Sequence, residues 1–287
     1  MKPDYYAPTS LADAFGVLSQ ANGKAVLAAG ATDLMLALRS HERKPALVID
    51  LSRLGLDAIR QADGEIILGA CVTHTQLIQS PLVQAHLPAL AAACSTIGGP
   101  PVRNRGTLGG NLANGSPAAD SAPPLLAYDA WLGLASAAGI RQVGLADFFL
   151  APRQTILGAD EVILEIHVPL PAGRTGAHFI KLGKRNAMAV AVVSVAVRLT
   201  LDEWGRIETA RIALGSVAPI PLRANAAEAA VQGAPIVEAR IAQAAALAPQ
   251  AASPISDVRA SAAYRSQMVA VLTRRALTAA RERLERS

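Results

Sequence analysis

Apolar positions in the first fifty residues change between helical and extended spacing. Over residues 11–18 they recur every three or four positions, as on one face of a helix, whereas the runs near residues 25 and 46 are short and continuous. The pattern predicts a helix over 11–18, a strand over 25–28, a helix over 33–39 and a strand over 46–50. The last three elements form a βαβ unit of about thirty residues, whose first loop, 29–32, lies at a helix N-terminus.

The middle of the chain predicts short strands and helices around one irregular segment. Residues 98–111 hold five glycines and two prolines and have neither helical nor strand periodicity, so a loop is expected there. Residues 116–128 are expected to be partly helical. The other predicted elements are strands over 65–72, 131–136, 140–143 and 161–168, with a hairpin around Gly139, and helices that begin at Thr73 and span 87–95.

Beyond the linker-like segment 169–173 the pattern changes to longer strands followed by helices. Antiparallel strands are predicted over 177–182, 189–201 and 208–214, and a turn near residues 202–205 joins the last two. Helices are predicted over 224–232, 237–247 and 261–286. The chain is therefore expected to form two α+β domains, residues 1–172 and residues 173–287.

Composition narrows the class of protein. Of the 287 residues, 52% are hydrophobic, 17% charged and 3% aromatic, and the mean hydropathy is +0.31, which excludes a disordered chain. The apolar excess favours large contacts with other subunits, although an alanine-rich composition alone gives the same values. The longest apolar run, 187–197, is shorter than the ~20 residues of a membrane span, and the N-terminus lacks a signal core. We expect a cytoplasmic protein without a membrane span.

Charge and motif content exclude several functions. The net charge is +5, from 27 Lys and Arg against 22 Asp and Glu, but the basic residues are scattered and no nucleic-acid binding is expected. Dinucleotide, phosphate-loop and serine-hydrolase glycine motifs are absent. No metal site and no catalytic side chain are expected, because the cysteines and histidines have no metal-ligand spacing and are expected to be ordinary core or surface residues. They are Cys71, Cys94, His41, His74, His86, His167 and His178.

Two segments have the composition of ligand-binding loops. Around residues 26–34, small side chains let backbone N–H groups approach a ligand, the helix N-terminus adds partial positive charge, and Thr32 could donate to a phosphate. An ordinary helix cap after a tight turn has the same pattern, so this signal alone leaves both interpretations open. The second segment is 103–120, where Gly106, Gly109 and Gly110 permit close approach.

Polar side chains strengthen the prediction that the second segment binds a ligand. Exposed amides there are expected to form an anion-binding concavity, and Asn111 and Asn114 can bond ribityl or phosphate oxygens. Asp120 can accept from a ligand hydroxyl or ring N–H, or cap the next helix. Two small-residue loops in one domain suit a ligand that carries two phosphates.

These loops resemble the FAD-binding medium subunit of the molybdenum hydroxylases, the family of xanthine dehydrogenase and carbon monoxide dehydrogenase. Residues 27–35 are similar to the first flavin loop of that family and residues 102–114 to its second, where Arg-Asn-x-x-Thr-x-Gly-Gly-Asn is the specific part. The resemblance continues in order along nearly the whole chain. One departure is Ala31, where the family often has glycine; a positive φ there costs alanine about 1 kcal/mol. Further similar segments are 116–125, 160–164, 178–181, 185–188 and 256–265.

The resemblance implies a fold, a cofactor and a set of binding residues. The fold is α+β, with a two-part FAD-binding domain of the vanillyl-alcohol oxidase-like (PCMH) type, 1–55 and 56–172, followed by a C-terminal α+β domain with an antiparallel sheet and helices, 173–287. FAD is expected to be held noncovalently between the two parts. The implied FAD-binding residues are Leu27, Ala28, Ala29, Gly30, Ala31, Thr32, Asp33 and Leu34 in the first loop, Gly106, Thr107, Leu108, Gly109, Gly110, Asn111, Asn114 and Asp120 in the second segment, and Val162, Ile163, Ile180 and Lys181 beyond it.

The resemblance also implies an electron-transfer role. FAD on this chain is expected to receive electrons from 2Fe–2S clusters on a small partner chain and to pass them to NAD, dioxygen or a quinone. A molybdopterin-type molybdenum cofactor on a large partner chain would hydroxylate the organic substrate with water, in a dimer of heterotrimers. Two distant cysteines cannot supply the 4Fe–4S insertion of the related benzoyl-CoA reductase subunits, so this chain is expected to carry flavin only.

Three points remain open from the sequence. The loop 184–188 either borders the flavin or is an ordinary hairpin. The chain could instead be a stand-alone FAD-dependent oxidoreductase of the same FAD-binding architecture, although such enzymes usually need a substrate domain and an active-site acid or base. A scaffold that has lost flavin is the third interpretation, and two intact loops argue against it.

Overall fold

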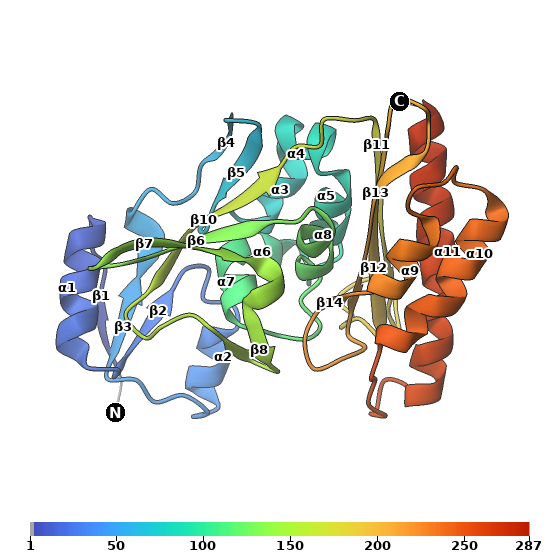
Figure 1. The fold of residues 1–287 in the computed structure, drawn as a ribbon. Coiled ribbons are helices and arrows are strands. Elements are labelled where there is room, and N and C mark those ends of the chain that lie inside the picture. The colour runs from blue at the N-terminus through green and yellow to red at the C-terminus, as the bar shows by residue number, and fades with distance from the viewer. Residues whose placement is uncertain (1–2, 287) are drawn as a thin grey trace.

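The computed structural model describes residues 3–286, which form three main sheets that follow one another from the N-terminal to the C-terminal end (Figure 1). The first sheet is parallel, in the order β1 (Asp4–Tyr6), β3 (Leu47–Asp50), β2 (Ala25–Ala28), with α1 (Leu11–Ala21) and α2 (Leu34–Arg39) beside it. The predicted βαβ unit is confirmed as β2, α2 and β3. Strand β1 was not predicted, because its three residues are all exposed and show no buried period.

The second sheet is antiparallel and carries the largest core. Its order is β4 (Ile59–Ala62), β5 (Glu65–Gly69), β10 (Val162–Pro169), β6 (Trp131–Ser136), β7 (Gly139–Gly144). The predicted hairpin is confirmed, since Ser136 pairs with Gly139 at the β6–β7 turn. The remaining elements of this region are η1 (Leu51–Arg53), α3 (His74–Gln79), α4 (Pro81–His86), α5 (Pro88–Ser95), α8 (Ala122–Ala127), η2 (Leu145–Asp147), β8 (Phe149–Ala151) and β9 (Gln154–Thr155).

The structure corrects the expectation for segment 98–111. It was expected to be a loop, but it contains α6 (Pro100–Arg103) and most of α7 (Leu108–Ala113). Thr107 caps α7, because its Oγ1 accepts from the Gly110 N–H at 3.2 Å. Glycines and prolines hide the helical period in the sequence, whereas burial of Leu108 and Leu112 supplies the stabilisation that intrinsic propensity lacks.

The third sheet is antiparallel and lies between two layers of helices (Figure 1). Every side chain of β12 is buried, because α11 covers one face of the strand and α8 packs on the other, while α5 packs on the neighbouring strand β11. The three long strands predicted here are confirmed, but β12 begins at Val193 rather than at residue 189. The elements are β11 (Thr175–Leu182), β12 (Val193–Leu201), β13 (Ile207–Gly215), β14 (Leu222–Arg223), α9 (Asn225–Val231), α10 (Glu238–Leu247), η3 (Ala248–Ala251) and α11 (Ala262–Arg286).

Ion pairs join the second and third sheets. Asp129, after α8, accepts from Arg198 at 2.7 Å, Arg211 at 2.7 Å and Arg223 at 3.1 Å, all from the third sheet. Charge-assisted bonds of this kind fix orientation as well as contact. The chain therefore presents the two sheets as one packed unit beside the smaller N-terminal sheet. None of the described helices is long and apolar enough to cross a bilayer.

Candidate functional site

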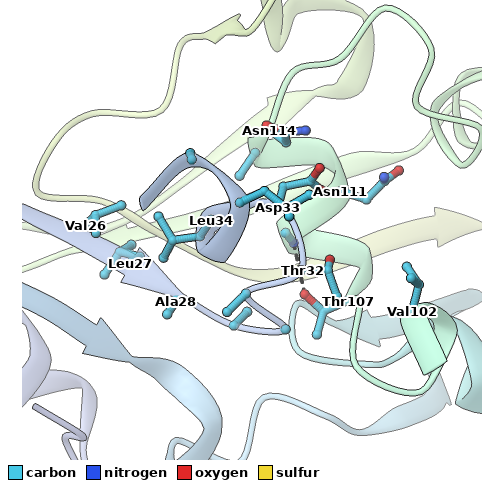
Figure 2. Close-up of a pocket in the computed structure, with 18 of the residues that line it drawn as sticks. Val26, Leu27, Ala28, Thr32, Asp33, Leu34, Val102, Thr107, Asn111 and Asn114 are labelled. Atoms are coloured by element: carbon cyan, nitrogen blue, oxygen red, sulfur yellow. Dashed lines mark hydrogen bonds between the residues drawn. The ribbon is translucent and has the colours of Figure 1, made fainter. Parts of the chain in front are cut away.

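A cavity of about 640 Å³ lies where the loop between β2 and α2 meets the segment around α7 (Figure 2). Its two main walls are 27–34 and 106–114, which are far apart in the sequence. Figure 2 shows Asp33 and Leu34 on one wall and Asn111 and Asn114 on the other. The predicted residues that line the cavity are Leu27, Ala28, Ala29, Gly30, Ala31, Thr32, Asp33, Leu34, Gly106, Thr107, Gly110, Asn111 and Asn114.

Two glycines let the loops touch. A Cβ on Gly30 would collide with the carbonyl oxygen of Arg105 and lie 2.9 Å from Cα of Gly106. A Cβ on Gly106 would lie 3.0 Å from the carbonyl oxygen of Val102 and 3.2 Å from Cδ2 of His74. The missing side chains therefore bring the two backbones into direct contact at the base of the cavity.

The first loop leaves its backbone donors free. Ala31 has a φ of 57°, the left-handed conformation considered above, and its carbonyl accepts from the Met35 N–H at 2.9 Å. Among residues 3–286, no protein acceptor bonds the N–H groups of Gly30, Ala31 and Thr32. Helix α2 has six residues and no buried side chain, so its dipole and packing contribute little. This loop offers convergent N–H donors to an anionic ligand.

The second loop uses its N–H groups internally. The Leu108 N–H donates to the Val72 carbonyl at 2.9 Å, and the Gly109 N–H donates to the Ala70 carbonyl at 2.8 Å. With the Gly110 N–H on Thr107 Oγ1, three consecutive amides are satisfied within the protein. The expectation of exposed amides is therefore wrong at these positions, because they close the start of α7 and dock it on residues 70–72, which follow β5.

Leu108 and Gly109 consequently lie outside the cavity lining. Leu108 is fully buried in the main core. A Cβ on Gly109 would be 2.7 Å from Cβ of Ala70 and 2.8 Å from its carbonyl oxygen. Gly109 is thus required for packing rather than for an approach of the backbone to a ligand.

The two asparagines at α7 have free side-chain donors. Asn111 Oδ1 accepts from the Ser121 hydroxyl at 2.6 Å, so this bond orients the amide and leaves its NH2 group without a protein partner among the described residues. Asn114 lines the same wall (Figure 2), and no hydrogen bond of its side chain occurs within residues 3–286. Both amides can donate to ligand oxygens.

Asp120 and Lys181 form a buried ion pair instead of lining the cavity. Lys181 Nζ lies 2.5 Å from Asp120 Oδ2 and also donates to the Thr96 carbonyl at 3.0 Å. Burial raises the pKa of Asp120 to about 6, against the opposing effect of Lys181. Its Oδ1 is buried and has no hydrogen-bond partner in the described part of the chain. The residue at the N-cap of α8 is Ser121, so Asp120 does not cap this helix. The pair ties β11 to the start of α8.

Three predicted apolar residues also lie outside the lining. Val162 and Ile163 are buried on β10, in two different hydrophobic clusters, and Ile180 packs from β11 on the core of the third sheet. The loop 184–188 lies in the connection 183–192 between the paired strands β11 and β12, with Met188 at a φ of 53° and its carbonyl accepting from Arg185.

Sequence reasoning missed part of the lining. His74 was expected to be an ordinary histidine, but it lines the cavity, and burial next to Arg103 lowers its pKa to about 4. No sequence signal marks it, because tertiary pairing places it beside Gly106. The lining residues Leu36, Ala37 and Ser40 lie at helical spacing from residue 33, so the sequence alone could have identified them. Val26, Val102 and Ala113 lie in the predicted loop segments but were not named as FAD-binding residues. The lining residues outside those segments are Leu36, Ala37, Arg39, Ser40, Glu42, Arg43, His74, Ile97 and Arg153.

Comparison with family models gives two matches that together span most of the chain. Residues 1–171 match the FAD binding domain in molybdopterin dehydrogenase. Residues 178–280 match the CO dehydrogenase flavoprotein C-terminal domain. The chain thus contains an FAD-binding domain, and the resemblance inferred from the two loops is confirmed.

Two relatives align with this chain over nearly their whole length. The xanthine dehydrogenase FAD-binding subunit of Escherichia coli O157:H7 is 36% identical over 279 residues, with 96% of this chain and 95% of the relative covered. The carbon monoxide dehydrogenase medium chain of Hydrogenophaga pseudoflava is 35% identical, with 96% of both chains covered.

Solved structures show the same fold. The carbon monoxide dehydrogenase of Hydrogenophaga pseudoflava that lacks the Mo-pyranopterin moiety superposes with a TM-score of 0.94 at 37% identity, covering 99% of this chain and 98% of that chain. Quinoline 2-oxidoreductase from Pseudomonas putida 86 gives 0.91 at 32% identity, with 99% of both chains covered. The chain belongs to the FAD-binding subunits of molybdenum-containing oxidoreductases of the xanthine dehydrogenase and carbon monoxide dehydrogenase type.

Proposed function

We propose that this protein is the FAD-carrying electron-transfer subunit of a heteromeric molybdenum hydroxylase and that the cavity between the two loops holds the FAD. The observation that carries the proposal is the meeting of residues 27–34 and 106–114 around one cavity. Its volume of about 640 Å³ falls within the ~300–1,000 Å³ typical of ligand sites. Free donors on both walls match the oxygen-rich centre of a dinucleotide.

The two walls have separate binding roles in this proposal. The N–H groups of Gly30, Ala31 and Thr32 donate to the pyrophosphate, with the Thr32 hydroxyl beside them. The side-chain amides of Asn111 and Asn114 donate to ribityl or phosphate oxygens. The other predicted residues that line the cavity are Leu27, Ala28, Ala29, Asp33, Leu34, Gly106, Thr107 and Gly110.

The predicted residues outside the lining are proposed to support it. Leu108 and Gly109 dock the second loop on the core. Asp120 precedes Ser121, which orients Asn111, so the Asp120–Lys181 pair fixes this part of the wall relative to β11. Val162, Ile163 and Ile180 form the apolar packing on which these polar groups rest.

The proposed partner chains define the route that electrons take through this subunit. With FAD bound, which supplies two-electron redox chemistry, the subunit accepts electrons from a small 2Fe–2S chain and delivers them to NAD, dioxygen or a quinone. A large chain carries the molybdenum cofactor and the organic substrate, in a dimer of heterotrimers in the cytoplasm. Apolar side chains exposed beside the third sheet support subunit contacts. These are Met188, Val190, Ile255 and Val258, which are 49–89% exposed.

The boundary between the two domains is proposed to lie at residues 172 and 173. There the chain passes from β10 of the second sheet to β11 of the third. The first domain is proposed to divide after residue 55, between η1 and β4, where the chain leaves the parallel sheet.

Purification of the full chain, alone and with the products of its neighbouring genes, tests the proposal. We expect a visible flavin absorption spectrum in both preparations and copurification with chains that carry 2Fe–2S clusters and molybdenum. Turnover of an organic substrate by the isolated chain would show a stand-alone oxidoreductase instead. A chain that binds no FAD in either preparation would be a scaffold.

A further inference from the structure

His74 is a buried histidine at the wall of the cavity, and neither nitrogen of its ring has a protein partner among the described residues. The residue is 2% exposed and lines the cavity. Its Nδ1 is buried and has no partner within residues 3–286. Its Nε2 has no protein partner among the described residues either, but it does not belong to the buried unpaired atoms. Nε2 is therefore the ring nitrogen that remains accessible from the cavity.

The backbone holds this ring against the second loop. His74 is the first residue of α3, which Thr73 and Gln76 cap reciprocally. The His74 N–H donates to the Gly106 carbonyl at 3.0 Å, and Thr73 pairs with Thr107 in an isolated bridge. A Cβ on Gly106 would lie 3.5 Å from Nε2. The Nε2 edge of the ring therefore lies beside the point where Gly30 meets Gly106.

Burial decides which form of the ring is present. Removal from water, with Arg103 nearby, lowers the pKa of His74 to about 4, so the ring is neutral near pH 7 and carries one proton. A buried N–H without an acceptor is rarer and costlier than an unused lone pair. The proton therefore resides on Nε2, where it is available to the cavity, and Nδ1 keeps a bare lone pair.

We propose that His74 is an FAD-binding residue that donates its Nε2–H to an oxygen of the phosphate–ribityl chain of the cofactor. The inference rests on the proposed FAD site and adds a side-chain donor at the base of the cavity, where the two loops touch. A ligand oxygen there satisfies a polar group that the protein alone leaves unpaired. Glycine at position 106 is then required for two reasons. It lets the two loops touch, and it leaves room for the His74 ring, which a larger residue at position 106 would displace from the ligand.

The test measures FAD affinity by flavin fluorescence on full-length protein from which FAD has been removed. His74→Phe keeps a packed ring without a donor, and His74→Gln keeps an amide N–H near the position of Nε2. We expect the Phe variant to bind FAD about tenfold to a hundredfold more weakly and the Gln variant to stay within a few-fold of wild type. His178→Phe is the matched control, because His178 also has a buried unpaired Nδ1 but lies outside the lining; its FAD affinity should not change.

Each outcome has one meaning. Wild-type affinity in His74→Phe overturns the inference, as does an equal loss in the Phe and Gln variants when their unfolding temperatures match wild type. Failure of the wild-type protein to bind FAD refutes the proposed function instead. If a variant fails to fold, nitrogen-15 NMR of the wild-type histidines decides, with His74 assigned by selective labelling. An Nε2–H tautomer that shifts on FAD binding supports the proposal, and an Nδ1–H tautomer or an unchanged signal contradicts it.

Discussion

The two loops that meet at the cavity are stabilised by opposite means. Residues 29–33 of the first loop are partly or fully exposed and lead into a helix with no buried residue. Three consecutive N–H groups of this loop have no acceptor in the part of the chain that the structure describes. In the second loop, the N–H groups of residues 108–110 are bonded within the protein, and Leu108 and Leu112 lie in the core. The first loop thus presents donors, and the second provides a rigid wall with side-chain amides.

This difference changes how glycine-rich loops are interpreted. Gly30 is required because a backbone from the other loop lies against it, and Gly109 because Ala70 does. Neither position is explained by ligand contact alone. Close approach to a ligand and close approach to the protein demand the same residue type, so composition cannot distinguish them.

The largest expected effect is a loss of stability on substitution in the second loop. In Gly109→Val, the new side chain meets Ala70 and its carbonyl oxygen, so we expect the free energy of unfolding of the FAD-free protein to fall by about 3 kcal/mol. Denaturant unfolding measures this. Gly16→Ala in α1, where nothing lies within 4 Å, is the matched control and should stabilise by at most ~1 kcal/mol. Equal stability of the Val variant and wild type would show that the second loop is not docked as described.

The next effect concerns His74, whose backbone is hydrogen-bonded to the second loop. The folded state holds His74 neutral down to a pKa of about 4, whereas the unfolded chain takes up a proton near 6.5. Acid therefore favours unfolding between these values, and stability is lost as the pH falls. We expect wild type to lose about 2 kcal/mol more than His74→Gln between pH 7 and pH 5, measured by unfolding of the FAD-free proteins. Parallel pH profiles would mean that His74 is solvated.

A smaller effect should appear in binding rather than in folding. Gly30→Ala places a Cβ against the Arg105 carbonyl, which forces the exposed first loop away from the second. We expect at least tenfold weaker FAD binding, about 1.4 kcal/mol, with less than about 1 kcal/mol lost from the FAD-free protein. Titration of FAD and unfolding of the same variant give both values. A stability loss as large as in Gly109→Val would remove the contrast between the loops.

The smallest effect tests the departure at Ala31. Glycine accommodates a φ of 57° without the steric cost that alanine bears, but it also gains freedom in the unfolded chain. We expect Ala31→Gly to raise the free energy of unfolding by about 0.5 kcal/mol and to keep FAD affinity within a few-fold. Destabilisation by the same amount would show that the turn is relaxed with alanine.

Much of the fold could be predicted, for identifiable reasons. The βαβ unit, the β6–β7 hairpin and the long strands of the third sheet were all predicted. Strands β3, β6 and β12 bury apolar side chains and therefore appear as apolar runs. Helix α2 and strand β7 bury almost nothing and were found from the loop 29–32 and from the turn around Gly139. Strands β1, β4, β8, β9 and β14 and helices α4, α6 and α7 were missed. β1 buries nothing, and helices α6 and α7 contain residues whose propensity opposes helix, so capping and tertiary packing decide their conformation.

The residues of the site were predicted or missed for the same reasons as the elements of the fold. Residues 27–34, with Asn111 and Asn114, were found because loop composition and the family motif mark them. His74 and Arg153 were not, because they reach the cavity through pairing with distant segments. Asp120 and Lys181 were expected at the flavin, and the structure places them in an ion pair with each other.

By itself, the sequence determined the family, the order of elements and the two loops that meet at the cavity, since periodicity and glycine-containing motifs are local properties of the chain. Only the tertiary structure decided which loop amides are free, which glycine packs against protein, and which histidine lines the cavity. Those properties depend on backbone atoms from segments tens of residues apart, such as Gly30 on Arg105 and Gly109 on Ala70. A hydrogen bond or a steric contact is a property of two positions in space, and one sequence specifies only their order along the chain.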